Sequence, residues 1–211
     1  MKYRRIVMAV IGVIITALSV GALKYAAFGV DPFQSFMSGL DSAVPLEYGT
    51  LYVIVNGVLL LFALVFDRHY IGLATFINLF LLGYVVEFTL YVLALLFPLP
   101  TVLTRIIMFL LGFVFISLGC SLYITADLGV STYDAIALVC TNKWKLCKFR
   151  YMRAITDFVC ISLGIGLFLL GGGNPKEIPT FVGAGTILTA FCMGALIEFF
   201  NHKISMPLLE K

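Results

Sequence analysis

Long uninterrupted apolar runs are the feature that most limits how this chain folds. Residues 6–27, 106–126 and 181–200 each reach the roughly 20 apolar residues with which a helix crosses a hydrocarbon core of about 30 Å. Only 12% of the residues are charged and 62% are hydrophobic, too few polar residues for a water-exposed surface. Because lipid cannot satisfy open backbone groups, and the runs do not alternate as barrel strands do, the sequence predicts an all-α integral membrane protein.

The two halves of the chain resemble each other. GVDPFQSF at 29–36 and GVSTYDAI at 129–136 both follow an apolar run and lie 100 residues apart. At an offset of 111, the first half aligns with the second at four small or polar positions: Gly72, Thr75, Gly83 and Glu87 match Gly183, Thr186, Gly194 and Glu198. These matches predict a duplication inside a single transmembrane domain spanning 1–211, with internal repeats at 1–100 and 101–211.

Each repeat reads as three long helices with a short helix after the first. The long helices are expected at 5–27, 48–66 and 70–97, then at 103–126, 152–170 and 179–201, and the short ones at 32–43 and 132–144. Three crossings are an odd number, so the second repeat lies inverted relative to the first. The sequence therefore predicts six transmembrane helices in two inverted three-helix repeats, each with an extra short helix that is either amphipathic and interfacial or re-entrant.

Basic residues predict the orientation, because short cytoplasmic loops accumulate lysine and arginine. With the N-terminus inside, only Lys24, Arg105 and Lys176 lie on the outer side, which leaves eleven of the fourteen Lys and Arg residues inside. The connection 28–48 carries no basic residue. We expect a multi-pass protein with a retained first helix and with both the N- and C-termini in the cytoplasm.

Both short helices begin with start signals. Asp31 accepts hydrogen bonds from free first-turn amides, and Pro32 loses nothing by lacking an N–H there. Ser131 with Asp134 three residues later resembles a capping box. If the helices are re-entrant, their positive N-terminal ends point into a cavity, and Gln34 lies on the polar side of the first.

Polar side chains recur inside the expected long helices, where an ionisable group costs a few kcal/mol. Asp157 aligns with Asn56 at an offset of 101, and Arg153 lies one turn before Asp157. Asp157 therefore forms either a structural i, i+4 ion pair or part of a binding site. Asn56, Thr75 and Thr186 suit hydrogen bonds between helices or a polar path.

Two further features have alternative explanations. Glu87 and Glu198 either end their helices or gate a cation or proton path at its two mouths. The basic stretch 143–150 either sets the topology or docks an acidic protein or anionic lipid.

Several function classes find no support in the sequence. The five cysteines contain no C-x-x-C pair, and G-x-S-x-G, H-E-x-x-H and P-loop motifs are missing. The net charge of +3 is too small to indicate a nucleic-acid partner. We expect no enzymatic activity, no metal and no cofactor.

These motifs resemble the YczE/YyaS/YitT family of bacterial integral membrane proteins. The resemblance rests on G-V-[DS]-[PT]-[FY]-x-[SA] after the first helix of each half and on G-x-G-T at 183–186, and it is clearest in the second half. The first half departs from the pattern at Gln34, Asn56 and Ala74. The resemblance implies a location in the bacterial plasma (inner) membrane and supplies no substrate.

Two functions from different classes follow. The leading hypothesis is a small-molecule secondary transporter or permease whose path lies between the halves. Asp134 and Asp157 then serve as coupling or binding carboxylates, and Glu87 and Glu198 lie near the mouths. The alternative is a non-transporting scaffold or substrate-binding subunit that works with a partner complex. The substrate, the coupling ion and homo-oligomer formation stay open.

Overall fold

The protein is helical throughout the part that its computed structural model describes, residues 2–210 without the side chains of residues 2, 48, 49 and 180. The long helices are α1 (Lys2–Ala26), α3 (Tyr48–Phe66), α4 (Leu73–Leu96), α5 (Val102–Ala126), α7 (Phe149–Leu170) and α8 (Ala184–Phe200). The short ones are α2 (Pro32–Ala43), α6 (Thr132–Leu138) and α9 (Met206–Glu210).

Five helices of the described part are long and apolar enough to cross a membrane: Tyr3–Ala26, Leu73–Leu96, Val102–Ala126, Phe149–Leu170 and Ala184–Glu210. The chain is thus a multi-pass helical membrane protein. The apolar part of α3, Thr50–Phe66, is shorter. Its role as the sixth of the expected crossings remains a prediction.

Several helix ends differ from the expected positions. Helix α8 begins at 184 rather than 179, because η3 (Pro175–Thr180) is a 3-10 turn containing Pro179, whose missing N–H prevents a continuous α-helix. Helix α4 begins at 73 rather than 70, after the 3-10 turn η1 (Arg68–Tyr70). Wider π-helical turns, which the apolar pattern did not indicate, follow α6 as η2 (Val139–Lys143) and α8 as η4 (Asn201–Ser205).

The expected starts of both short helices are confirmed. The Asp31 carboxylate accepts a hydrogen bond from the Gln34 N–H at 3.2 Å, with Pro32 as the first helical residue. The Ser131 hydroxyl accepts from the Asp134 N–H at 3.0 Å. The Asp134 carboxylate binds side chains in the protein interior and does not complete a capping box.

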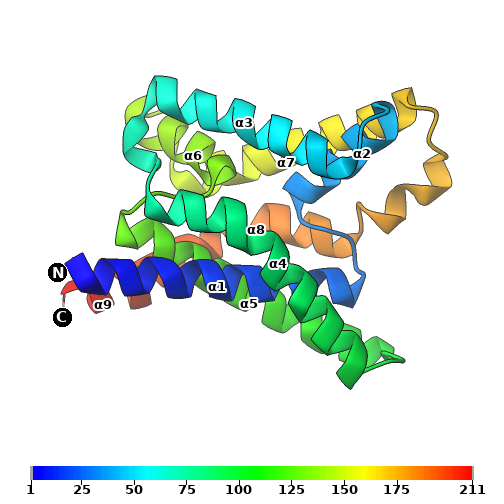
Figure 1. Ribbon diagram of the computed structural model, residues 1–211, viewed down its shortest axis with the longest axis horizontal. Helices are drawn as coiled ribbons and strands as arrows, with labels where there is room; N and C mark the ends of the chain where they lie inside the picture. The colour runs from blue at the N-terminus through cyan, green and yellow to red at the C-terminus, as the bar shows by residue number, and fades with distance from the viewer. Residues whose placement is uncertain (1, 211) are drawn as a thin grey trace.

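The helices form two layers that lie closest together at the end where both termini are found (Figure 1). Helices α1, α4 and α5 form one layer, and α2, α3, α6 and α7 form the other, while α8 packs against both α5 and α7. Helices α1 and α5 run antiparallel at the centre, because Gly12 lies against Gly119 whereas Gly112 lies against Leu23. These glycines let the two backbones approach closely.

The segments that follow α1 and α5 make matching contacts with the opposite half. Gly29 and Gly129, with φ of +98° and +97°, adopt the left-handed conformation that favours glycine. Each segment then bonds to the start of the last helix of the other half. The matched bonds are Thr186 Oγ1 to Val30 O (2.5 Å) and Thr75 Oγ1 to Val130 O (2.7 Å), and Gly185 N to Phe28 O (2.9 Å) and Ala74 N to Leu128 O (3.0 Å).

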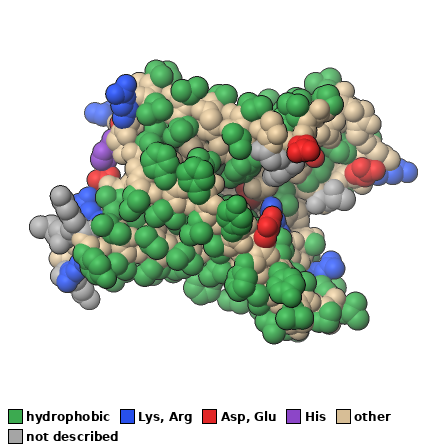
Figure 2. Space-filling view, in the orientation of Figure 1, with side chains coloured by type: hydrophobic (Ala, Val, Ile, Leu, Met, Phe, Trp, Pro, Cys, Tyr) green, Lys and Arg blue, Asp and Glu red, His purple; other side chains and the backbone are tan. Residues whose placement is uncertain are grey.

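The two halves differ in how tightly their last two helices pack. Helix α7 lies along α8, where the rings of Phe158 and Phe191 meet at a centroid distance of 4.7 Å. Between α3 and α4 there is instead a cleft of about 600 Å³, lined by residues that include Tyr52 and Gly83. Figure 2 shows the mostly apolar surface of this face, interrupted by a few acidic and basic side chains.

Candidate functional site

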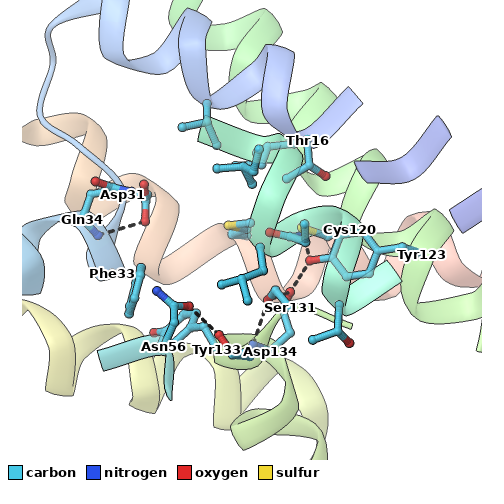
Figure 3. A pocket seen from close by; sticks show the side chains of 18 of the residues that line it. Thr16, Asp31, Phe33, Gln34, Asn56, Cys120, Tyr123, Ser131, Tyr133 and Asp134 are labelled. Atoms are coloured by element: carbon cyan, nitrogen blue, oxygen red, sulfur yellow. Dashed lines mark hydrogen bonds between the residues drawn. The ribbon is translucent and has the colours of Figure 1, made fainter. Parts of the chain in front are cut away.

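The first turns of α2 and α6 face a common central cavity of about 100 Å³ (Figure 3). Asp31, Phe33 and Gln34 enter it from α2, and Tyr133 and Asp134 enter it from α6. The rings of Phe33 and Tyr133 approach each other at a centroid distance of 5.3 Å. The two short helices therefore start beside one another in the interior, although they lie 100 residues apart in the chain.

A buried guanidinium links two carboxylates beside this cavity. Arg153 Nη1 donates to Asp134 Oδ1, and Arg153 Nε lies 3.4 Å from Asp157 Oδ1. The residues are 6%, 2% and 0% exposed respectively, so water does not screen these charges. Tyrosines complete the arrangement: Tyr123 donates to Asp134, and Tyr133 donates to Asp157 at 2.6 Å.

The charges of this cluster do not balance. Asp134 and Asp157 are two carboxylates that share the single positive charge of Arg153. Asp157 Oδ2 is buried without a hydrogen-bond partner. An uncompensated buried charge costs several kcal/mol. The cluster therefore has the charge balance to take up a proton or a cation. Within residues 2–210, no three His, Cys, Asp or Glu side chains are grouped so as to hold a metal ion.

Asn56 connects the cavity wall to α6. Its side-chain oxygen accepts a hydrogen bond from the Thr132 hydroxyl at 2.7 Å, and its amide donates to the Tyr52 carbonyl at 2.9 Å. This is the expected hydrogen bond between helices. Thr75 and Asn78 of α4 also line the cavity. The wall is thus polar on several sides although it lies among apolar helices.

The central cavity adjoins the cleft between α3 and α4, since both are lined by Gln34, Tyr52 and Leu79. Farther out, the cleft is lined by Lys24 and by the exposed Glu87. The cleft therefore lies between the surface and the cavity at the starts of α2 and α6.

Polar and aromatic contacts link neighbouring segments at the end of the molecule that carries the termini. Asp127 pairs with His69 at 2.6 Å and with Arg5 at 3.3 Å. In the basic stretch, Lys143 donates to the Phe66 carbonyl, and the Trp144 ring packs on Phe66 at a centroid distance of 5.1 Å. The start of that stretch thus holds η2 against the end of α3.

The residues singled out from the sequence fall into three groups. Asp134, Asp157, Asn56, Gln34 and Thr75 lie in or beside the central cavity, together with the helix start Asp31. Glu87 lies in the outer cleft. Thr186 binds the Val30 carbonyl, and Glu198 is half-buried near the end of α8; neither lines the cavity or the cleft.

Sequence reasoning missed several residues of the site. Arg153 was considered only as a partner of Asp157, yet it also binds Asp134 across helices. Phe33 and Tyr133 lay on the apolar stripes of the short helices, and Tyr52 and Tyr123 lay within apolar runs. Phe33 and Tyr133 hold the aromatic position of the repeated G-V motif, which could have identified them, whereas no signal separates Tyr52 and Tyr123 from lipid-facing aromatic residues.

Known proteins are similar to this chain along most of its length. The chain is 27% identical over 191 residues to the uncharacterized membrane protein YczE of Bacillus subtilis (strain 168). The aligned residues cover 89% of this chain and 81% of that protein. It is 24% identical over 201 residues to the uncharacterized protein YyaS of the same organism, with 95% and 92% covered. An uncharacterized protein of Haemophilus influenzae (strain ATCC 51907 / DSM 11121 / KW20 / Rd) is 25% identical over 205 residues, with 97% and 86% covered.

No solved structure matches the chain. These relatives confirm the resemblance to YczE and YyaS. Residues 3–202 match the family described as "Family of unknown function (DUF6198)", which is nearly the whole chain. The protein therefore belongs to this DUF6198 family.

Proposed function

We propose that this chain is a small-molecule permease or secondary transporter of the bacterial plasma membrane, and not an enzyme. The observation that carries the proposal is the polar cavity at the facing starts of α2 and α6, which adjoins a surface cleft. Transporters commonly bind their substrates where half-helices end within the membrane, between two repeats. Glu87 belongs to the open mouth in this proposal, and its counterpart Glu198 belongs to the closed one.

Two inverted repeats with re-entrant short helices are part of the proposal. The matching bonds of the segments after α1 and α5 support the pairing of the halves. A re-entrant α2 is favoured over an interfacial one, because it begins at the central cavity and then runs along α7, with Gly39 against Gly164 and Ser42 against Gly171. Helix α3 is then the sixth crossing.

Inverted repeats predict that the ends of α2 and α6 reach opposite compartments. In a variant whose native cysteines are replaced, we expect Ser42→Cys to react with a membrane-impermeant maleimide from outside. Asn142→Cys should react from the cytoplasm. Labelling of intact cells, compared with labelling of inverted vesicles, measures both. Reaction of the two positions from the same compartment would contradict the inverted arrangement, and with it the proposed path.

Movement of α3 relative to α4 supplies the transport step. Gly57 of α3 and Gly83 of α4 have no atom near the place where a β-carbon would lie. In the second half, by contrast, Gly194 of α8 packs against Arg150 of α7. If each repeat adopted the conformation that the other repeat has in this structure, α3 would close on α4 and α7 would separate from α8. The cavity would then open toward the end that carries the termini.

The exchanged state predicts a cross-link between α3 and α4 that should not form while the cleft between them is open. Phe158 and Phe191 align with Gly57 and Phe80 at the repeat offsets of 101 and 111. We expect the pair Gly57→Cys and Phe80→Cys to form a disulfide under mild oxidation, because these positions meet in the exchanged state. The pair Phe158→Cys and Phe191→Cys, in contact here, is the matched control. Gel mobility before and after reduction measures both.

The same cysteine pair tests transport. Proteoliposomes on a solid-supported membrane receive a panel of small cations, amino acids, sugars and organic acids, and charge movement is recorded. We expect one class to produce a current that disappears when Gly57→Cys and Phe80→Cys are cross-linked and returns on reduction. If the control pair cross-links while the first pair never does, alternation of the repeats is wrong.

A further inference from the structure

We propose that the solute bound in the central cavity is a small organic cation, such as a primary or quaternary ammonium ion. Its charge lies at the Asp31 carboxylate, and its alkyl part lies against the rings of Phe33 and Tyr52. This inference rests on the proposed function and names its substrate class.

The excess of negative charge lies in the central cavity. Asp31, Asp134 and Arg153 line it, and Asp157 lies directly behind Arg153. Three carboxylates thus face one guanidinium. Lys24 lines the outer cleft with Glu87, and its charge also acts on Asp31, so the cavity and the cleft together hold four carboxylates and two basic groups. A cation entering the cavity reduces the net charge of a low-dielectric site, whereas an anion increases it.

The helix N-termini do not reverse this preference. Free first-turn amides attract anions, and two such ends meet here. Each end already carries its own carboxylate, however. Asp31 accepts the Gln34 N–H of α2, and Asp134 lies in the first turn of α6. The cavity therefore presents carboxylate oxygens where an anion would require free donors.

Aromatic rings provide the second recognition element. Arg153 shows that a cation is stable on such a face, because its guanidinium lies 4.5 Å from the centroid of Tyr133. Phe33 continues this group of rings, 5.3 Å from Tyr133 and 6.2 Å from Tyr52 between centroids. Asp31 lines the cavity beside Phe33 and Tyr52. A carboxylate next to rings is the arrangement that binds alkylammonium groups.

The volume restricts the size of the solute. The central cavity measures about 100 Å³. Since one water needs on the order of 10–15 Å³ by this measure, the cavity holds roughly seven to ten waters. A ligand with a few non-hydrogen atoms fits such a space. Large cations do not.

The test is a binding measurement on the full chain in detergent, by titration calorimetry. The probes are tetramethylammonium, ethylammonium and guanidinium, compared with acetate and inorganic phosphate. We expect at least one of the cations to bind and both anions to fail. Asp31→Asn should weaken cation binding by about tenfold or more while keeping the helix cap, since Asn and Asp cap equally well. Phe33→Leu should weaken it several-fold.

Asp41→Asn is the matched control, because it removes the same charge from an exposed position of the same helix. It should leave the affinity unchanged. If Asp31→Asn fails to fold, Asp31→Ser copies the cap that Ser131 provides to α6. Binding of acetate or phosphate, equal binding by Asp31→Asn and wild type, or binding of no cation would each overturn the cation assignment. The permease proposal has a separate test. It fails if the pair Gly57→Cys and Phe80→Cys never cross-links α3 to α4.

Discussion

Replacing Arg153 by Gln is expected to destabilise the protein by about 3–5 kcal/mol, the cost of breaking a buried ion pair from one side. The change leaves Asp134 and Asp157 without a cation at positions that are 2% and 0% exposed. Asp157 does not line the central cavity and cannot turn toward water. Thermal unfolding of the detergent-solubilised protein, followed by size-exclusion chromatography, measures the loss.

Removing the two carboxylates together with the guanidinium distinguishes the cost of unpaired buried charge from the cost of lost packing. Adding Asp134→Asn and Asp157→Asn to Arg153→Gln removes all three charges and should recover much of the stability. Asp157→Asn alone leaves one guanidinium and one carboxylate, so it should cost much less than Arg153→Gln. Arg150→Gln, at an exposed position of the same helix, should change stability by no more than about 0.5 kcal/mol. If the Arg153→Gln variant unfolds at the same temperature as the Arg150→Gln variant, the cluster contributes little to the stability of the fold.

The helices and their starts could be predicted because their causes are local. Apolar runs of membrane length indicated five of the spans. The starts at Asp31 and Ser131 followed from residues within one turn of each other. The ends that differed, at α4 and α8, depend on 3-10 turns before them, where Pro179 and the loop geometry override the apolar pattern.

The composition of the site depends on contacts between distant segments, which periodicity does not report. Asp157 was singled out because an ionisable residue in an apolar run needs a partner, and Asp134 because it follows Ser131 by three residues at a helix start. That Arg153 bridges them depends on how α6 packs on α7. Gly83 and Gly194 align while their neighbours differ, so this pair of glycines does not reveal the difference between the α3–α4 cleft and the α7–α8 contact. The sequence does show that Gly57 stands where the second half has Phe158.

Close backbone contact between α2 and α7 gives the second large effect. A β-carbon on Gly39 would lie 2.6 Å from the Cα of Gly164, and in return one on Gly164 would lie 2.9 Å from the Ser35 carbonyl carbon. Backbone atoms cannot rotate away as a side chain does. Gly39→Val should therefore force α2 off α7 and destabilise the protein by about 1–3 kcal/mol or more. It should also displace Asp31 and Phe33, so cation binding should fall with stability.

Gly57→Ala and Gly83→Ala are the matched controls, because no atom lies within 4 Å of either added β-carbon. Alanine favours a helix by up to about 1 kcal/mol over glycine, so both variants should unfold at the wild-type temperature or above it. If α3 closes on α4 during transport, Gly83→Ala places a methyl group where the closed state needs contact. Charge movement should then slow while stability rises. Equal unfolding temperatures for Gly39→Val and Gly83→Ala would show that α2 does not depend on close contact with α7, and the wall of the cavity would need another explanation.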